Sequence, residues 1–206
     1  MWYKIKSRLN FFLKSSNQHG IHSPFVYDLI TKCFYDKSPY SAYDNLKILR
    51  NELTNNQDLV EIKHYSSSSK VFQQNHQKIS TILKNEGSSY KKQKQLFRIT
   101  NYLKPKNVLE LGTSIGLGSA AMAFASNKSI ITTVEVNENL SDIAKKVFRC
   151  YQLKNIRIEN SAFKDFFKNI NNKHLDLVYL DGTYDKKSTI ENFNSLLKYA
   201  HNESVF

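Results

Sequence analysis

Residues 108–123, with the sequence VLELGTSIGLGSAAMA, constrain the fold of this chain more than any other stretch. A hydrophobic run that suits a buried strand breaks into glycines and resumes as small, helix-compatible residues. Gly112 and Gly116 lack a β-carbon, so the backbone can bend tightly there and let a ligand approach closely. The helix that follows offers unpaired backbone N–H groups to a carboxylate or a phosphate. This stretch therefore predicts a strand, a ligand-binding turn and a helix in succession.

Strand-like and helix-like segments alternate from Lys106 onward. The strand-like segments are residues 107–112, 129–136, 155–160 and 175–182, and the helix-like segments are residues 118–126, 139–151, 163–170 and 188–200. Strict alternation predicts an α/β fold with a doubly wound parallel sheet. Ligands bind such sheets beyond the carboxyl ends of the strands, near the point where the strand order reverses. The turn after the first strand faces that crevice.

Residues 1–104 are predicted to form helices and loops. Helical patterns occupy residues 2–14, 22–34, 43–53, 71–84 and 89–103, with a polar break at residues 65–70. Ser23 can cap the second helix and Pro24 suits its first turn, whereas Pro105 stops the last helix. We therefore expect a helical N-terminal cap region, residues 1–104, followed by a doubly wound α/β domain, residues 105–206.

The composition restricts the classes of partner and compartment. The formal net charge is +12, and residues 1–104 hold 17 basic and 7 acidic side chains, against 13 and 11 in residues 105–206. This asymmetry suits an acidic partner such as nucleic acid, anionic lipid or a phosphorylated substrate. Only five of the 30 basic residues are arginine, however, which favours a solvated surface. No run approaches the roughly 20 apolar residues of a membrane span. Two distant cysteines, Cys33 and Cys150, argue against a disulfide framework or a zinc site and favour a cytoplasmic location.

Two nucleotide-binding patterns compete for the glycine turn. Residues 116–121, GLGSAA, match the dinucleotide fingerprint GxGxxG/A, which should begin at the end of the strand. The strand ends at Leu111, however, and the first glycine is Gly112, so the loop is wider than the fingerprint requires. The spacing therefore argues against NAD and for a different nucleoside.

VLELGTSIGLGSA resembles motif I of class I S-adenosylmethionine-dependent methyltransferases. It is most similar to the catechol and caffeoyl-CoA O-methyltransferase branch, in which an E-(I/L)-G-T-x-x-G pattern recurs, and the resemblance covers residues 88–206. Residues 88–107 lie where that branch has a helix that contributes to the cofactor pocket. The resemblance implies a Rossmann-like methyltransferase fold, S-adenosylmethionine as cofactor, and methyl transfer to an oxygen of a small-molecule acceptor by in-line displacement.

The resemblance also assigns roles at the ends of the first three strands. Glu110 would fix the loop and face the ammonium of the cofactor's methionine part. Backbone groups of the glycine turn would contact the same part; they belong to Gly112, Thr113, Ser114, Gly116 and Gly118. Glu135 closes the second strand, where a carboxylate can accept both hydroxyls of a ribose. Ser161 and Ala162 follow the third strand, where the family binds the adenine ring and many members carry Asp in place of Ser161.

The fourth strand ends at Asp181, which is the candidate catalytic residue and would also border the cofactor. Its segment LDLVYLDG resembles the D-x-V-F-I-D strand of the O-methyltransferase branch. In metal-dependent members the matching Asp binds a divalent cation together with an Asp–Asn pair after the fifth strand. Such a cation would lower the pKa of an acceptor hydroxyl. Gly182 and Thr183 depart from that pattern, so metal-dependent and metal-independent forms both stay open.

The sequence ends at HNESVF, residues 201–206, where a further strand is expected to begin. A methyltransferase sheet usually has further strands after this point. We therefore expect a sheet that is incomplete after its fourth strand, in a fragment or truncated product that keeps most cofactor contacts and catalyses poorly. A methyltransferase acting on nucleic acid or protein is one alternative, and a non-catalytic cofactor-binding scaffold is another. The oligomeric state is not predicted.

Overall fold

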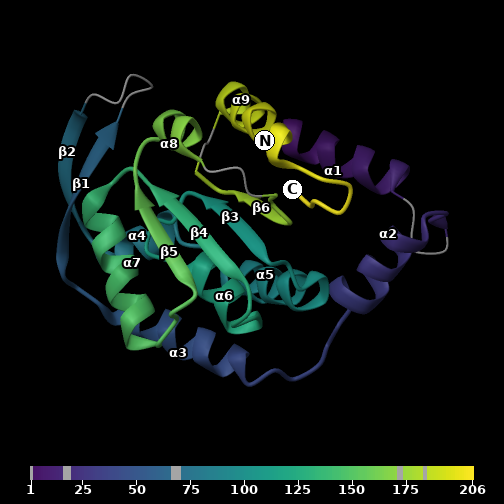
Figure 1. The fold of residues 1–206 in the computed structure, drawn as a ribbon, viewed down its shortest axis with the longest axis horizontal. Helices are drawn as coiled ribbons and strands as arrows, with labels where there is room; N and C mark the ends of the chain where they lie inside the picture. Colours follow the sequence, from purple (N-terminus) through teal and green to yellow (C-terminus); the bar gives the residue numbers. More distant parts are fainter. Residues whose placement is uncertain (1, 16–19, 66–70, 171–173, 183–184) are drawn as a thin grey trace. The chain divides into compact units, whose positions relative to one another are not determined.

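The computed structural model describes residues 2–15, 20–65, 71–170, 174–182 and 185–206 (Figure 1). The chain divides into two compact units, one ending at Ser38 and the other comprising residues 39–206. The unit that contains the parallel sheet begins at Pro39, because helices ahead of the sheet add buried side chains to its core. The role of residues 1–104 as a cap stays a prediction.

The first unit contains Trp2–Lys14 (α1), Pro24–Asp28 (α2) and the π-helical Leu29–Phe34 (η2). The Ser23 hydroxyl accepts a hydrogen bond from the Val26 N–H at 3.4 Å, and Pro24 is the first residue of α2. The predicted cap and first turn are therefore confirmed. Among the helices of the described residues, none is long and apolar enough to cross a membrane.

A β-hairpin replaces part of a helix that was predicted over residues 71–84. Leu59–Tyr65 (β1) and Val71–Lys78 (β2) pair antiparallel, and the helix begins at Ile79 (α4, Ile79–Asn85). The prediction was wrong because residues 73–78 are Gln, Gln, Asn, His, Gln and Lys, which provide no apolar stripe for a helix. The conformation of this segment is set by pairing with another strand, which local preference does not report.

Two other predicted helices, at residues 43–53 and 89–103, are confirmed as Ala42–Asn55 (α3) and Tyr90–Leu103 (α5). The Ser89 hydroxyl caps α5 by accepting the Lys92 N–H at 3.3 Å. Buried leucines on α3 and the buried Leu96 and Phe97 of α5 join the core of the second unit. This packing is why residues 39–104 belong to the same unit as the sheet.

The second unit is built on a parallel sheet with the strand order β5-β4-β3-β6. Its strands are Asn107–Leu111 (β3), Ile130–Glu135 (β4), Ile156–Asn160 (β5) and Leu177–Leu180 (β6). The helices that follow them are Leu117–Ala125 (α6), Glu138–Cys150 (α7), Phe163–Asn169 (α8) and Lys186–Leu196 (α9), which continues into the 3-10 turn Leu197–Tyr199 (η3). The predicted doubly wound α/β fold is confirmed. The strand order reverses between β3 and β6, which locates the expected crevice.

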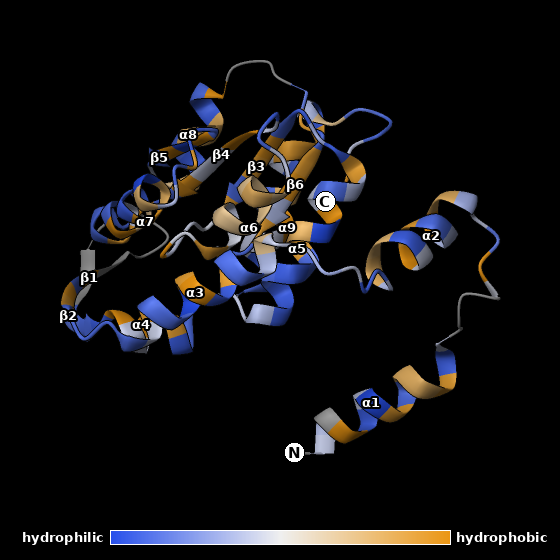
Figure 2. Cartoon of the chain, turned by 90° about the horizontal axis from the view of Figure 1, so that it is seen from below, coloured by the Kyte–Doolittle hydropathy of each residue, from blue (hydrophilic) through white to orange (hydrophobic). Residues whose placement is uncertain are grey.

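Side chains of β3 alternate between the two faces of the sheet. Val108 packs with α5 and α6, whereas Leu109 packs with α8 and α9 on the other face. Glu110 lies two residues after Val108, so its carboxylate enters the α5–α6 side, where Thr133 of β4 and Tyr179 of β6 are its register partners. Val108, Leu109 and Leu111 of β3 are apolar, and Figure 2 shows β4 as a largely hydrophobic strand. An acid is therefore built into an otherwise apolar strand.

Val205 pairs with the open side of β6. It forms a parallel bridge with Leu177, and its carbonyl oxygen accepts the Val178 N–H at 2.8 Å. At the strand predicted to begin in residues 204–206, the structure therefore contains a single parallel bridge, between Val205 and Leu177.

Candidate functional site

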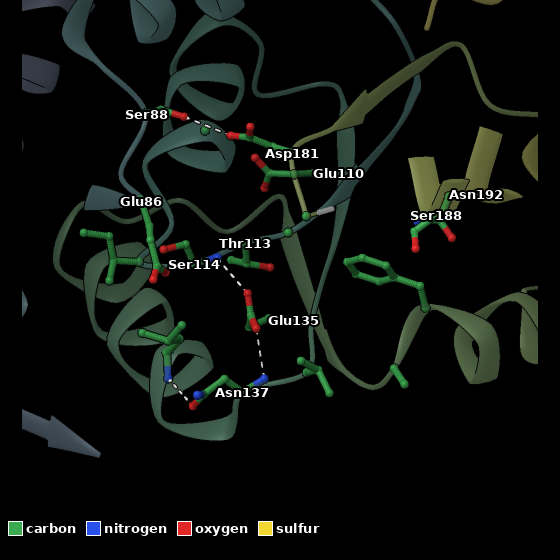
Figure 3. A pocket seen from close by; sticks show the side chains of 18 of the residues that line it. Glu86, Ser88, Glu110, Thr113, Ser114, Glu135, Asn137, Asp181, Ser188 and Asn192 are labelled. Carbon is green, nitrogen blue, oxygen red and sulfur yellow. Dashed lines mark hydrogen bonds between the residues drawn. The ribbon is translucent and has the colours of Figure 1, made fainter. Parts of the chain in front are cut away.

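A cleft of about 910 Å³ lies at the carboxyl ends of β3, β4 and β6 (Figure 3). Of the predicted site residues, eight line it: Glu110, Gly112, Thr113, Ser114, Gly118, Glu135, Ala162 and Asp181. Two others, Gly116 and Ser161, do not line it. Residues that follow four separate strands, β3, β4, β5 and β6, therefore converge on one cavity, at the place where doubly wound sheets bind ligands.

The turn after β3 passes close to the end of β6. Gly112 has a φ of +98°, and a β-carbon on it would lie 2.5 Å from the Cα of Gly182. A β-carbon on Gly182 would in turn overlap the Phe163 ring and lie 3.0 Å from the Cα of Gly112. The two glycines therefore allow both backbones to meet at the floor of the cleft. The glycine at residue 182 departs from the family pattern, and in this chain the close approach of Gly112 and Phe163 explains why a residue without a side chain stands there.

The remaining glycines of the turn have different roles. Gly116 has a φ of +84° and begins α6, and a β-carbon there would lie 2.8 Å from the Phe148 ring on α7. It serves helix packing in this structure, and its predicted contact with a cofactor stays a prediction. Gly118 does line the cleft, and a β-carbon on it would overlap the Oε1 atom of Glu110. The absence of a side chain at residue 118 thus makes room for the buried carboxylate.

Glu110 is 1% exposed and is held by hydroxyl groups. Ser119 and Thr133 both donate to its Oε2 atom, Thr133 at 2.6 Å, and Thr113 lies 2.6 Å from Thr133, oxygen to oxygen. Burial raises the pKa of Glu110 to about 7, although the two hydroxyl hydrogen bonds oppose the rise. No lysine, arginine or histidine of the described residues forms an ion pair with it. Glu110 is therefore a buried acid whose counter-charge would come from a ligand.

Glu135 at the end of β4 is 9% exposed and is fixed from both sides. Its Oε1 accepts the Asn137 N–H and its Oε2 accepts the Ser114 N–H, each at 2.9 Å (Figure 3). Burial raises the pKa of Glu135, and these amide hydrogen bonds oppose the rise. Because each carboxylate oxygen has two acceptor sites, each keeps capacity for one further donor. The arrangement presents two fixed acceptor oxygens to the cleft.

The loop after β5 is tied to the end of β4. The Ser161 N–H and the Asn160 side-chain amide both donate to the Glu135 carbonyl oxygen, at 3.1 Å and 3.0 Å. The Ser161 hydroxyl donates to the Ala162 carbonyl at 2.9 Å, so it is directed at its own loop. Ala162 and the neighbouring Phe163 line the cleft. The predicted adenine contact from the Ser161 side chain stays a prediction.

Asp181 lines the cleft and anchors a polar cluster behind it. Its Oδ1 lies 2.8 Å from the Lys92 Nζ, and its Oδ2 accepts the Tyr179 hydroxyl at 2.9 Å. The Ser88 hydroxyl also reaches Oδ2, at 3.4 Å. Burial and the nearby Asp181 carboxylate raise the pKa of Tyr179, which keeps its hydroxyl a donor. Thr183, the second departure from the family pattern, lies outside the described residues.

Several cleft residues were not singled out from the sequence. Ser88 and Gly87 precede α5, and Asn137 caps α7. Three further polar residues come from α9 and its N-cap: Asp185, Ser188 and Asn192. Two of these positions carried a readable signal, because Asn137 and Asp185 are N-cap residues whose side chains accept backbone N–H groups. The described residues contain no group of three or more His, Cys, Asp or Glu side chains that could hold a metal ion.

Comparisons with known proteins give matches among solved structures. No protein-family model matches the chain, and no curated protein matches it. The O-methyltransferase from Bacillus cereus in complex with SAH is 16% identical over 86% of this chain and 68% of its own, with a TM-score of 0.56. The O-methyltransferase TomG from Streptomyces achromogenes, in complex with SAM, is 16% identical over 91% of this chain and 71% of its own, with a TM-score of 0.55.

A third similar structure is a caffeoyl-CoA O-methyltransferase, so described provisionally, from Staphylococcus aureus. It is 25% identical over 54% of this chain, with a TM-score of 0.49, and this chain spans 53% of its length. The identities to the two more extensive matches are low, so the likeness concerns the fold. The structural neighbours are S-adenosylmethionine-dependent O-methyltransferases, as the sequence resemblance predicted, and this chain has the Rossmann-like fold of class I methyltransferases.

Proposed function

We propose that this chain binds S-adenosylmethionine and transfers its methyl group to an oxygen of a small-molecule acceptor. The observation that carries the proposal is the geometry of Glu135. Both of its oxygens are held by backbone amides of adjoining turns, and both can accept one further hydrogen bond. Two fixed acceptors on one carboxylate match the two neighbouring hydroxyls of a ribose. The position of Glu135 at a strand end beside the glycine turn suits a nucleoside ligand.

Other cleft residues fit the remaining parts of this cofactor. Ser114 has a buried hydroxyl with no hydrogen-bond partner among the described residues, and it lies in the turn that would hold the methionine part. A bound ammonium group would favour the ionised form of Glu110, whose pKa is about 7 without such a partner. Ala162 and Phe163 offer a small and an apolar surface to an adenine ring. When bound, the cofactor supplies an electrophilic sulfonium methyl group.

Asp181 is the residue of this chain that would orient the acceptor. Its carboxylate lines the cleft and is fixed by Lys92 and Tyr179, so it can accept a hydrogen bond from an acceptor hydroxyl in a defined direction. Orientation of the attacking oxygen is the main contribution that a protein makes to methyl transfer. The walls contributed by Ser88 and by the start of α9 would restrict the shape of the acceptor.

The charge of the cleft favours a small molecule over a nucleic acid. Six lining residues are acidic and two are lysine: Glu86, Glu110, Glu135, Asp181, Asp185 and Glu191 against Lys164 and Lys187. A polyanion would be repelled there although the whole chain carries +12. Binding of an RNA or DNA oligonucleotide that weakens steeply with salt and is competed by S-adenosylhomocysteine would favour the nucleic-acid alternative instead.

Calorimetric titration with S-adenosylhomocysteine tests the cofactor assignment. We expect the unmodified chain to bind and Glu135→Ala to bind roughly 10- to 100-fold more weakly, because two hydrogen bonds to a charged group are lost. Glu203→Ala is the matched control, since Glu203 is exposed and does not line the cleft. A folded chain that does not bind, or a Glu135→Ala variant that binds as well as the control, would refute the assignment.

Release of S-adenosylhomocysteine from S-adenosylmethionine, measured with a panel of phenols and aliphatic alcohols, tests the transfer step. We expect acceptor-dependent release that Asp181→Asn reduces at least tenfold. Cofactor binding without release on any acceptor would favour the non-catalytic scaffold.

A further inference from the structure

Asp181 belongs to a cluster assembled from two elements far apart in the sequence. Lys92 comes from the first turn of α5, Ser88 from the segment before it, and Tyr179 from β6. Lys92 Nζ lies 2.8 Å from Asp181 Oδ1 and 5.3 Å from the centre of the Tyr179 ring. The ammonium is therefore held by an ion pair and a cation–π contact at once.

The position of Lys92 follows from how α5 begins. Ser89 caps the helix by accepting the Lys92 N–H, which fixes Lys92 as the third residue of α5. Its charge then stands at the end of β6, where the Tyr179 hydroxyl already donates to Asp181. The neighbouring Lys94 takes another direction, because its ammonium lies over the rings of Tyr43 and Tyr90. Of these two lysines of α5, Lys92 is the one that serves Asp181.

The residues around Asp181 do not fit a divalent cation. Such a cation needs carboxylate oxygens as direct ligands at about 2.0–2.6 Å. Here one oxygen carries the Lys92 ammonium, and the other accepts the hydroxyls of Tyr179 and Ser88. A metal bound to Oδ1 would stand beside a charge of the same sign. The described residues also lack a group of three or more side chains able to ligate it.

We propose that Lys92 is the resident cation of Asp181 and excludes a divalent metal from this wall of the cleft. The role of Lys92 toward the acceptor rests on the function proposed above. The exclusion of a metal ion by Lys92 does not depend on that function. In that reaction the acceptor oxygen bonds to the methyl carbon, the carbon–sulfur bond breaks with its electrons passing to sulfur, and the hydroxyl proton leaves to Asp181 or to water. Lys92 acts through Asp181 and is a positioning residue, because it fixes the carboxylate that faces the acceptor.

Titration with Mn²⁺, followed by the electron paramagnetic resonance signal of the free ion, tests this directly. The chains compared are the unmodified protein, Lys92→Met, Lys92→Arg, Asp181→Asn, the double variant Lys92→Met with Asp181→Asn, and the control Lys94→Met. We expect Lys92→Met to bind Mn²⁺ at least tenfold more tightly than the unmodified protein and the double variant to lose that gain. Lys92→Arg keeps the charge and should behave like the unmodified protein, as should Lys94→Met.

Two results would overturn the proposal. One is Mn²⁺ binding by the unmodified protein that Asp181→Asn abolishes, which would make Asp181 a metal ligand despite Lys92. The other is a folded Lys92→Met variant with no gain in Mn²⁺ affinity, because Lys92 would then exclude nothing. Circular dichroism confirms folding of each variant. If Lys92→Met unfolds, the comparison of the unmodified protein with Asp181→Asn still tests whether Asp181 binds Mn²⁺. The Mn²⁺ titrations do not depend on the binding of S-adenosylhomocysteine. Their result can therefore be interpreted even if the chain does not bind the cofactor.

Discussion

Glu110 shows how a single residue links the strand pattern of the sequence to the chemistry of the cleft. Its place in the run VLELG predicted a site residue, and the structure places it in the cleft lining. The sequence did not reveal which groups would surround it, because Ser119 and Thr133 reach it from α6 and β4. The same limit applies to Lys92, whose partner Asp181 is 89 residues away. The sequence predicted Glu110 and Asp181 as site residues, whereas their hydrogen-bond and ion-pair partners depend on the tertiary fold.

The buried Glu110 should make stability depend on pH. Its pKa is about 7 in the folded chain against an ordinary value of 4.5, so the folded state holds a proton that the unfolded state releases. The free energy of unfolding therefore falls as pH rises from about 4.5 to about 7, by roughly 3 kcal/mol at most. Glu110→Gln removes this term. We expect its melting temperature relative to the unmodified chain to rise between pH 5 and pH 8, and a difference that stays constant with pH would contradict the burial argument.

Gly112 and Gly182 separate two steric effects. Gly112→Ala combines a φ of +98° with a close approach to Gly182, whereas Gly182→Ala meets only neighbouring atoms. We expect Gly112→Ala to destabilise the chain by about 2–4 kcal/mol and Gly182→Ala by less, because the Phe163 ring can move. Urea unfolding of both variants measures the difference. Equal losses would mean that backbone strain at residue 112 adds nothing.

At the scale of elements, the sequence predicted what local pattern determines. The alternation of hydrophobic and helix-compatible segments predicted β3 to β6 and α6 to α9, and Ser23 predicted the cap of α2. The β1–β2 hairpin was missed because its strands are polar and are defined by pairing with each other. An element whose conformation depends on pairing with another segment cannot be predicted from the hydrophobic pattern of its own residues.

The start of β3 and the segment after η3 are joined by Asp176. Its Oδ2 accepts the N–H groups of Lys106 and Asn107, each at 2.7 Å, and its Oδ1 lies 2.9 Å from His201 Nε2. Burial alone would raise the pKa of Asp176, but these hydrogen bonds lower it below its ordinary value. Stability from this group is present above the ordinary pKa and is lost as pH falls through the lowered value.

Asp176→Asn should therefore destabilise the chain at pH 7 by about 2–3 kcal/mol, because an amide cannot replace both acceptor oxygens. Thermal unfolding at pH 7 measures this loss. Asp142→Asn is the control, since Asp142 is an exposed partner of Lys145 whose ion pair is screened by solvent and should contribute little to stability. A loss no greater than that of the control would show that Asp176 does not hold these segments together.

At the scale of the whole molecule, the cleft belongs to one of the two units. Every residue that lines it lies between Ile62 and Asn192, within the unit that begins at Pro39. We expect a chain of residues 39–206 to fold cooperatively and to bind S-adenosylhomocysteine within about threefold of the full chain's affinity. Circular dichroism and calorimetry check this. A loss of more than tenfold would show that residues 1–38 contribute to the site, as the predicted cap region implies.

The acidic lining of the cleft has a further consequence for the proposed reaction. S-adenosylmethionine carries a positive sulfonium charge that S-adenosylhomocysteine lacks. The six acidic residues that line the cavity should therefore attract the cofactor more strongly than the product. A cationic analogue with an amine in place of the sulfonium should bind more tightly than S-adenosylhomocysteine at about 0.02 M salt, and the ratio should shrink at about 0.5 M. Product inhibition would then be weaker than in a neutral cavity of the same shape, since electrostatics alone would favour exchange of the spent cofactor for a fresh one.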